Sequence, residues 1–191
     1  MPDEPQTPPD PAEERALIER ACAGDRFAIG ALYDLHIDRI YRYILFRVNG
    51  NHSDAEDITA EVFIRMVEYL PRYEWKGAPF QSWLYKIAAS QVVSHYRKPG
   101  NRASTPIDDM DLSDPHAGPD ALVDHRLTLK DVYEAAKRLP EAQRRVIELR
   151  FGADLSVRET AQVLNKSENN VKVLQHKALE RLKKLLRNDP K

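Results

Sequence analysis

Residues Leu155 to Ala178 read LSVRETAQVLNKSENNVKVLQHKA, and this stretch decides the fold of its part of the chain. Ser156 precedes Glu159 by three residues, which is the capping-box spacing found at the start of a helix. Ala161 is small enough to lie where two helices cross, and Asn165 tolerates the left-handed backbone of a tight turn. A second helix follows, with apolar residues at helical spacing: Val171, Leu174 and Ala178. The stretch therefore predicts a helix-turn-helix.

The opposite face of the second predicted helix carries amides, cations and small apolar groups, Gln175 among them. Such groups read base edges and thymine methyls in the major groove, while flanking cations hold phosphates without reading sequence. Helix pairs with a small turn also occur in proteins that bind no DNA, so this pattern alone leaves a purely structural role open. The predicted DNA-contacting residues are Arg158, Lys166, Ser167, Glu168, Asn169, Asn170, Lys172, Val173, His176 and Lys177.

The formal net charge of −1 hides a strong asymmetry along the chain. Arg126 to Lys191 carry sixteen basic and nine acidic residues. Met1 to Asp25 carry two basic and seven acidic residues, and Pro99 to His125 carry one and six. A basic C-terminal module between acidic stretches favours a nucleic acid or another polyanion as its partner.

Apolar residues also recur at helical spacing upstream, and no alternating strand pattern competes with them. Asp25 is placed to cap a helix reaching Val48, and Ser53 with Glu56 forms a second capping box. A further helix is expected from Phe80 to about Arg97. Prolines and acids concentrate before and after this region. The predicted fold class is all-α: two small helical domains, 12–98 and 126–187, with a flexible acidic linker 99–125 and tails 1–11 and 188–191.

Several classes of protein are disfavoured by composition. The single cysteine, Cys22, excludes an internal disulfide framework. No apolar run is long enough to span a membrane, and the acidic, proline-rich start is unlike a signal peptide, so we expect a cytoplasmic protein. The six histidines show no metal-ligand spacing, and neither a nucleophile motif nor a glycine-rich phosphate loop is present. We therefore expect no catalytic residues, metal or cofactor.

Three stretches resemble one known family. They are DAEDITAEVFIRMVEYL from Asp54, FQSWLYKIAASQVVSHYRK from Phe80, and RLPEAQRRVIELRFGADLSVRETAQVLNKSENNVKVLQHKALERLKKLL from Arg138. In their order and spacing they resemble regions 2.2, 2.3–2.4 and 4 of the extracytoplasmic-function (ECF) sigma factors of RNA polymerase. The resemblance implies a transcription initiation factor that recognises a minus-10 element through region 2 and a minus-35 element through region 4, and that aids promoter melting.

The resemblance also implies partners. Core RNA polymerase would be bound through the clamp helices of its largest subunit and the flap of its second subunit, and an anti-sigma protein is a further expected partner. The candidate polymerase-binding residues lie mostly at four-residue spacing opposite an apolar stripe: Asp54, Asp57, Glu61 and Arg65. Without the resemblance, these residues would be read as an ordinary solvated face of a helix.

Aromatic and basic residues alternate around the helix that starts at Phe80, a pattern suited to holding a single DNA strand. Phe80 and Trp83 are expected mainly in the core. The predicted minus-10 contacts are Trp75, Lys76, Trp83, Tyr85, Lys86, Ser90, Arg97 and Lys98. Ser90 and Ser94 stand where the family usually has Asn and Asp, and Val173 with Leu174 replaces the frequent Ser and Arg, which puts the promoter preference in doubt. A regulator that binds DNA through its helix-turn-helix without polymerase is the alternative function.

Overall fold

The computed structural model describes residues 11–75, 77–97 and 129–187, and every regular element in these ranges is helical. Four helices form the N-terminal half: α1 (Pro11–Cys22), α2 (Arg26–Arg47), α3 (His52–Tyr69) and α4 (Phe80–Arg97). Four more form the C-terminal half: α5 (Leu129–Lys137), α6 (Glu141–Ile147), α7 (Val157–Leu164) and α8 (Glu168–Arg187). The all-α prediction is confirmed for this part of the chain. The predicted linker and most of both tails lie outside the described residues.

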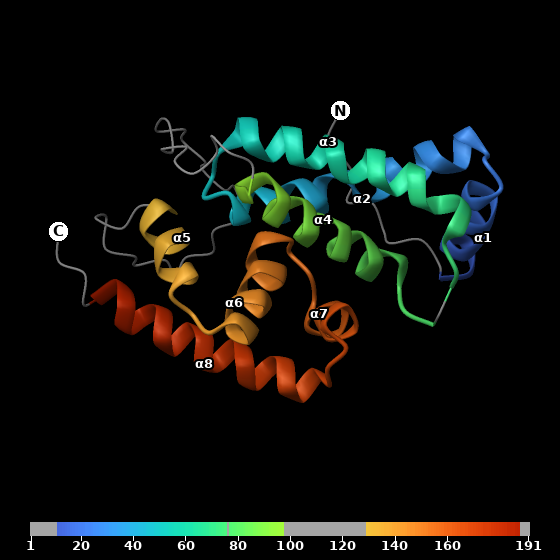
Figure 1. The fold of residues 1–191 in the computed structure, drawn as a ribbon. Coiled ribbons are helices and arrows are strands. Elements are labelled where there is room, and N and C mark those ends of the chain that lie inside the picture. The colour runs from blue at the N-terminus through green and yellow to red at the C-terminus, as the bar shows by residue number, and fades with distance from the viewer. Residues whose placement is uncertain (1–10, 76, 98–128, 188–191) are drawn as a thin grey trace, which may run out of the picture.

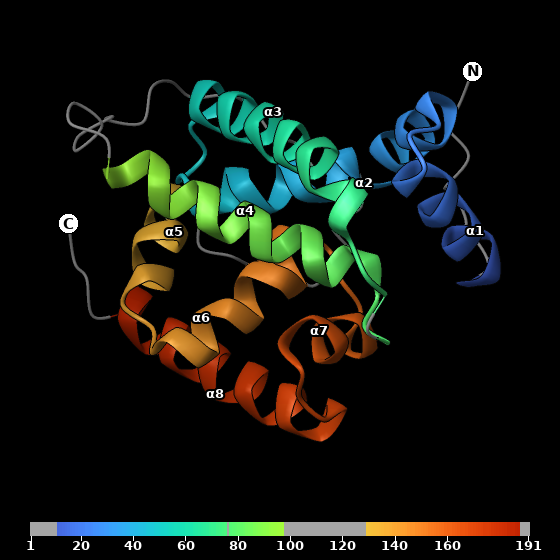
Figure 2. The same ribbon diagram turned by 45° about the vertical axis from the view of Figure 1, so that its right-hand side comes forward.

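The two halves pack directly against each other. Figures 1 and 2 show α2, α3 and α4 stacked on one side, with α6 and α7 between them and α8. The largest cluster of buried apolar side chains joins residues of α2, α3 and α4 to Leu149, Ala153, Leu155 and Val163 of the C-terminal half. The helix-turn-helix therefore shares its core with the N-terminal helices.

Two short helical turns supplement the α-helices. A 3₁₀ turn, η1 (Leu70–Arg72), follows α3, and a π-helical turn, η2 (Glu148–Gly152), extends α6. In η2 the amide of Ala153 donates to the carbonyl of Glu148 at 3.0 Å, which is the five-residue spacing of a π-turn. This wider turn was not visible in the sequence, where nothing distinguishes it from a continuous α-helix.

Capping side chains set where the N-terminal helices begin. Asp25 caps α2 as predicted, with its carboxylate accepting hydrogen bonds from the amides of Phe27 and Ala28 at 2.9 and 3.3 Å. The predicted capping box of Ser53 with Glu56 is wrong. Asn51 caps α3 instead, because its side chain reaches the amide of Asp54 at 3.1 Å and the helix already begins at His52.

The contact between α2 and η2 leaves no room for a side chain at Gly152. Phe46 of α2 covers this glycine and meets the ring of Tyr133 edge-on, with 5.1 Å between ring centroids. A Cβ at Gly152 would lie 2.9 Å from the Cβ of Phe46, closer than carbon atoms pack. The glycine is thus a condition for the close approach of the two halves.

We predict opposite effects for alanine at two glycines. Gly152→Ala should lower the free energy of unfolding by about 1–3 kcal/mol, because the methyl group overpacks the contact with Phe46. Gly30→Ala, in an exposed position within α2 with nothing within 4 Å of the new carbon, should raise it by about 0.5–1 kcal/mol. Urea denaturation of both variants measures the difference, and an equal response would contradict the proposed packing.

Candidate functional site

The helix-turn-helix is formed by α7 and α8 as the sequence predicts. Ser156 accepts from the amide of Glu159 at 3.1 Å, and the Glu159 carboxylate accepts from the amide of Ser156 at 2.7 Å. Both halves of the predicted capping box are therefore present. Asn165 ends α7 in the left-handed region, with φ of 50° and ψ of 53°. Ala161 is buried, and the amide of Lys166 donates back to its carbonyl at 2.9 Å.

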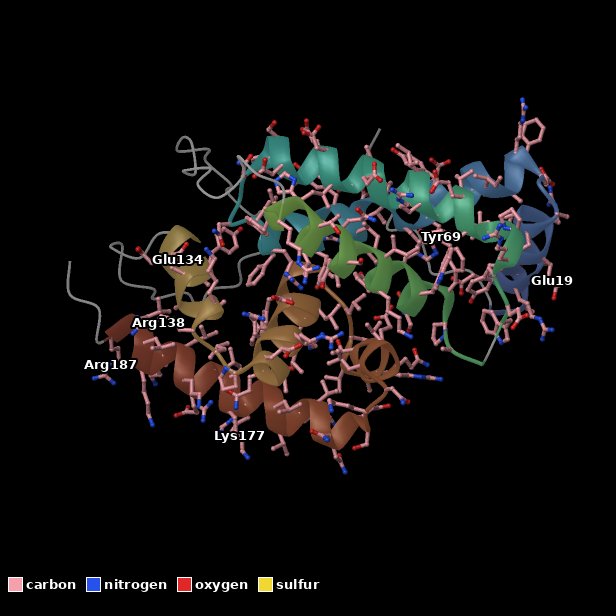
Figure 3. The ribbon with its side chains drawn as sticks, in the orientation of Figure 1. Glu19, Tyr69, Glu134, Arg138, Lys177 and Arg187 are labelled. Carbon is pink, nitrogen blue, oxygen red and sulfur yellow. The ribbon has the colours of Figure 1, made fainter. Side chains whose placement is uncertain are left out.

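Helix α8 packs against the rest of the C-terminal half through one apolar side. Val171 and Ala178 are fully buried, and Leu174 packs against the small cluster formed by Val146, Ala161 and Val171. Lys177 points away from the body of the molecule (Figure 3). All ten residues predicted to contact DNA in this segment are exposed: Arg158, Lys166, Ser167, Glu168, Asn169, Asn170, Lys172, Val173, His176 and Lys177. The structure thus leaves these side chains accessible.

The charged face of α3 is partly internally paired. Arg65 donates to Glu61 at 3.0 Å and to Glu68 at 2.8 Å, while Asp57 is exposed. Asp54 is different, because it accepts a hydrogen bond from Asn51 at 3.0 Å and lies 3.4 Å from His95 of α4. Asp54 therefore has a structural role at the start of α3, besides any role on the surface.

Two exposed apolar residues on α3 were missed in the sequence. Ile64 is 53% exposed and Val67 is 45% exposed, beside the paired charges of Glu61, Arg65 and Glu68. The available signal was their position off the apolar stripe of Ile58, Val62 and Met66, which is buried as expected. Exposed apolar groups ringed by charges are typical of surfaces that bind another protein.

The residues predicted around the start of α4 are divided between core and surface. Phe80 is fully buried, as expected, and Trp83 is half-buried against Tyr73, with 4.8 Å between ring centroids. Trp75 is 39% exposed. Lys86, Ser90 and Arg97 are exposed, whereas Lys76 and Lys98 lie outside the described residues.

Tyr85 differs from its expected position. It was predicted to be accessible for DNA contact, but only 3% of it is exposed. Its ring packs edge-on against Tyr43 of α2, with 5.1 Å between centroids, and the same burial raises the pKa of its hydroxyl. Together with Lys86, Arg145 and Glu148, these tyrosines line a small cavity between the two halves. In this arrangement Tyr85 belongs to the interface between α4 and the C-terminal half.

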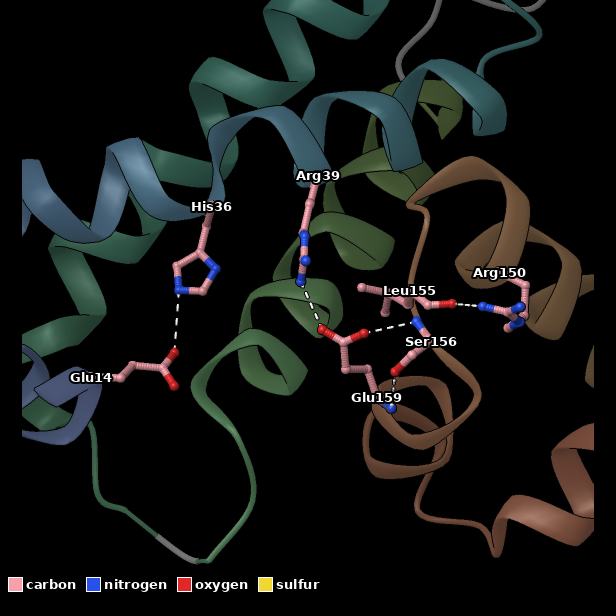
Figure 4. A network of polar contacts seen from close by, with 7 residues as sticks. All are labelled: Glu14, His36, Arg39, Arg150, Leu155, Ser156 and Glu159. Carbon is pink, nitrogen blue, oxygen red and sulfur yellow. Dashed lines mark hydrogen bonds and ion pairs between the residues drawn. The ribbon is translucent and has the colours of Figure 1, made fainter. Parts of the chain in front are cut away.

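Two ion pairs cross that interface. Arg39 of α2 donates to Glu159 of α7 at 2.8 Å, and Figure 4 shows Glu159 meeting Arg39 and Ser156 at once. Arg47 of α2 donates to Glu148 of η2 at 3.1 Å and to the hydroxyl of Tyr43 at 3.0 Å. The Glu148 side chain is only 4% exposed, and this burial raises the pKa of its carboxyl although the nearby arginines oppose the shift. These long-range pairs were not predicted from sequence patterns.

The described residues also bear on metal binding and on membrane insertion. They hold no group of three or more histidine, cysteine or acidic side chains placed to bind a metal ion. Among the same residues, none of the helices combines the length and the apolar character needed to cross a membrane.

Family models match both halves of the chain. Residues 32–102 match the model described as Sigma-70 region 2, and residues 135–184 match Sigma-70, region 4. The second match includes the whole helix-turn-helix, and the first includes α3 and α4.

Three relatives with similar sequences are named as ECF RNA polymerase sigma factors. The ECF RNA polymerase sigma factor BldN of Streptomyces coelicolor is 36% identical over 181 residues, covering 94% of this chain and 68% of BldN. ShbA of Streptomyces griseus, also an ECF sigma factor, is 36% identical over 185 residues, covering 89% of this chain and 93% of ShbA. The ECF sigma factor SigD of Mycobacterium tuberculosis is 32% identical over 172 residues, covering 88% and 81%.

Among solved structures, CnrH in complex with the cytosolic domain of CnrY matches with a TM-score of 0.63 at 24% identity. The match covers 93% of this chain and 99% of that chain, and it supports the fold.

Glu159 provides a test of the interface through its charge. Burial tends to raise the pKa of its carboxyl, but the hydrogen bonds from Ser156 and Arg39 outweigh burial and place it below the usual 4.5. At pH values above the usual pKa of 4.5, the ionised carboxylate therefore stabilises the folded state. This contribution is lost as the pH falls through the lowered pKa of the folded protein. We predict that Glu159→Gln lowers the free energy of unfolding by about 1 kcal/mol at neutral pH.

The deficit of Glu159→Gln should shrink as urea denaturation is repeated at successive pH values below 4.5. Glutamine can still complete the capping box through its one carbonyl oxygen, so the variant removes the charge and the hydrogen bond from Arg39 to the other oxygen. Glu180→Gln, at an exposed position of α8, is the control and should differ little from wild type at any pH. A deficit for Glu159→Gln that does not depend on pH would contradict this account.

Proposed function

This chain belongs to the extracytoplasmic-function sigma factors of RNA polymerase, and we propose that it contacts two promoter elements, one through residues of α4 and one through residues of α8. It is a transcription initiation factor, which directs core polymerase to promoters and is not itself an enzyme. The observation that carries the proposal is the exposed polar face of α8, held in place by the capped α7 and its left-handed turn. As an initiation factor it would act in the bacterial cytoplasm.

The contact with the minus-35 element is proposed for the N-terminal half of α8. Asn169 and Asn170 offer amides for adenine edges, and Val173 offers an apolar group for a thymine methyl. Lys166 and Arg158 flank the turn and α7, where cations hold phosphates and fix the register of the helix in the groove. Serine at position 167 accepts from the amide of Asn170 at 3.3 Å, so that the start of α8 is ordered before DNA arrives.

The contact with the minus-10 element is proposed for the loop before α4 and for the exposed side of that helix. Trp75 is an exposed aromatic ring on which an unpaired base can stack, and Lys86, Ser90 and Arg97 lie exposed along α4. A contact by Tyr85 would require α4 to separate from the C-terminal half, because that contact now covers its ring.

The polymerase-binding surface is proposed for the outer face of α3. Asp57, Glu61 and Arg65 supply charge there, and Ile64 with Val67 adds apolar surface beside them. Fully solvated ion pairs contribute little to affinity, whereas apolar groups within a charged rim commonly carry it. We therefore extend the proposed surface to these two residues. The C-terminal half would meet the flap of the second subunit, and an anti-sigma protein would compete for these surfaces.

The function is tested by mixing the full chain with sigma-free core polymerase and promoter DNA. Initiation at defined promoters that depends on both upstream elements is expected, together with weak binding to duplex DNA in the absence of core polymerase. Tight, sequence-specific binding of the free protein to duplex DNA, without initiation, would favour a regulator that acts without polymerase.

We predict that Asn169→Ala and Lys172→Ala each reduce initiation at promoters that depend on the minus-35 element by about tenfold. One good base contact or phosphate contact corresponds to roughly that factor. Binding to core polymerase should stay unchanged in a pull-down. Lys183→Ala, a lysine on the same helix about three turns beyond Lys172, is the matched control. Loss of polymerase binding in the first two variants would contradict the division of labour between α8 and α3.

We predict the converse behaviour for α3. Asp57→Ala combined with Ile64→Ala should weaken binding to core polymerase by about tenfold or more, because charge and apolar area are both removed from the surface. Glu56→Ala, at the neighbouring exposed position, should bind normally. Fluorescence anisotropy with labelled protein measures the affinities, and circular dichroism checks the helix content. Equal affinities for these proteins would remove α3 from the proposed surface.

A further inference from the structure

Arg150 lies in η2, immediately before the helix-turn-helix, and its side chain is half-buried. Its Nε donates to Oε1 of Gln175 in α8 at 3.1 Å. Its Nη1 donates to the carbonyl oxygen of Leu155, the residue before the cap of α7, as Figure 4 shows. One guanidinium therefore joins three places: the π-turn, the entry of α7 and the middle of α8.

Gln175 lies toward the inner side of α8 and not on the outer surface. It is half-buried, whereas His176 and Lys177 next to it are exposed. A glutamine that reads adenine must accept from the base with its carbonyl oxygen and donate with its amide nitrogen. The carbonyl oxygen of Gln175 already accepts from Arg150, which directs that end of the amide toward η2.

The remaining support of α8 is mostly apolar and therefore weakly directional. Val171, Ala178 and Leu182 bury their side chains beneath the helix. Apolar contacts favour burial but tolerate small rotations of a helix about its axis. Hydrogen bonds depend strongly on distance and angle, and a planar guanidinium offers donors in fixed directions. Arg181, six residues after Gln175, adds a longer contact of 3.4 Å to Gln143 of α6.

We propose that Arg150 is a positioning residue for minus-35 recognition, and that Gln175 is its partner within the protein and not a reader of bases. The pair fixes the rotation of α8 relative to α7, so that Asn169, Asn170 and Lys172 enter the groove in one orientation. This inference rests on the proposed function of α8. The base preference at the minus-35 element then comes from the outer residues, while the sharpness of that preference depends on Arg150.

Substitutions at Gln175 separate the two roles. Gln175→Glu keeps an acceptor for Arg150 and converts the hydrogen bond into an ion pair. A positioning role predicts initiation within about twofold of wild type and an unchanged preferred hexamer. A reading role predicts a changed preference, because glutamate accepts from cytosine and cannot donate to adenine. Gln175→Leu removes the acceptor and should reduce minus-35-dependent initiation by about fivefold, with the preferred hexamer again unchanged.

Arg150→Met should have the larger effect, about tenfold, because the carbonyl of Leu155 loses its donor as well. The double variant with Gln175→Leu should be no weaker than Arg150→Met alone, since both changes break the same hydrogen bond. Asn169→Ala is the positive control for a residue that reads bases, and it should alter the preferred hexamer.

The measurement is run-off transcription by core polymerase with the full-length variants, on a library randomised across the minus-35 hexamer. Thermal denaturation shows whether each variant folds, and if Arg150→Met does not, the two Gln175 variants decide the question. A changed preferred hexamer in either Gln175 variant, or full additivity in the double variant, would overturn the inference alone. If wild type shows no dependence on the minus-35 hexamer, the proposed function fails and this inference fails with it.

Discussion

The buried ion pair between Arg47 and Glu148 is the contact on which the arrangement of the two halves depends. The Glu148 side chain is 4% exposed, and a carboxylate so far from water is costly unless a cation and hydrogen bonds compensate it. Arg47 supplies both across the interface, where it is oriented by the hydroxyl of Tyr43, and Arg144 of α6 adds a second cation 3.5 Å from Glu148. Such a pair adds little net stability, but it strongly disfavours any register in which either partner is left alone.

The neighbouring contacts follow from that register. With Arg47 set against η2, Phe46 lies over Gly152, and the π-turn gives the backbone the width to pass beneath its ring. Arg39, two turns earlier on α2, then reaches Glu159 at the first turn of α7. The carboxylate that caps the helix-turn-helix is therefore also a point of attachment to the N-terminal half.

Sequence patterns predicted the features that depend on nearby residues. The helices from α2 onward, the left-handed turn at Asn165 and the exposed face of α8 follow from capping and periodicity within a few positions, whereas α1 was not predicted. The capping box at Ser53 failed because Asn51, two residues earlier, caps the helix through the amide of Asp54, which places Ser53 inside the first turn. Tyr85 was misplaced because it is buried by residues distant in the sequence, Tyr43 of α2 and the C-terminal residues around Glu148. The role of Gln175 was equally hidden, since its partner Arg150 lies on another turn.

Because Tyr85 is covered, binding to its side of α4 differs energetically from binding to the accessible faces of α3 and α8. A ligand of the covered side of α4 binds only molecules whose halves have separated, so its apparent dissociation constant is the intrinsic one divided by the fraction that is open. Ligands of the outer faces of α3 and α8 meet no such factor, because those residues are already accessible. The interface therefore couples binding at distant sites. A partner that binds the separated form more tightly raises the affinity of the protein for any other partner that binds only the separated form.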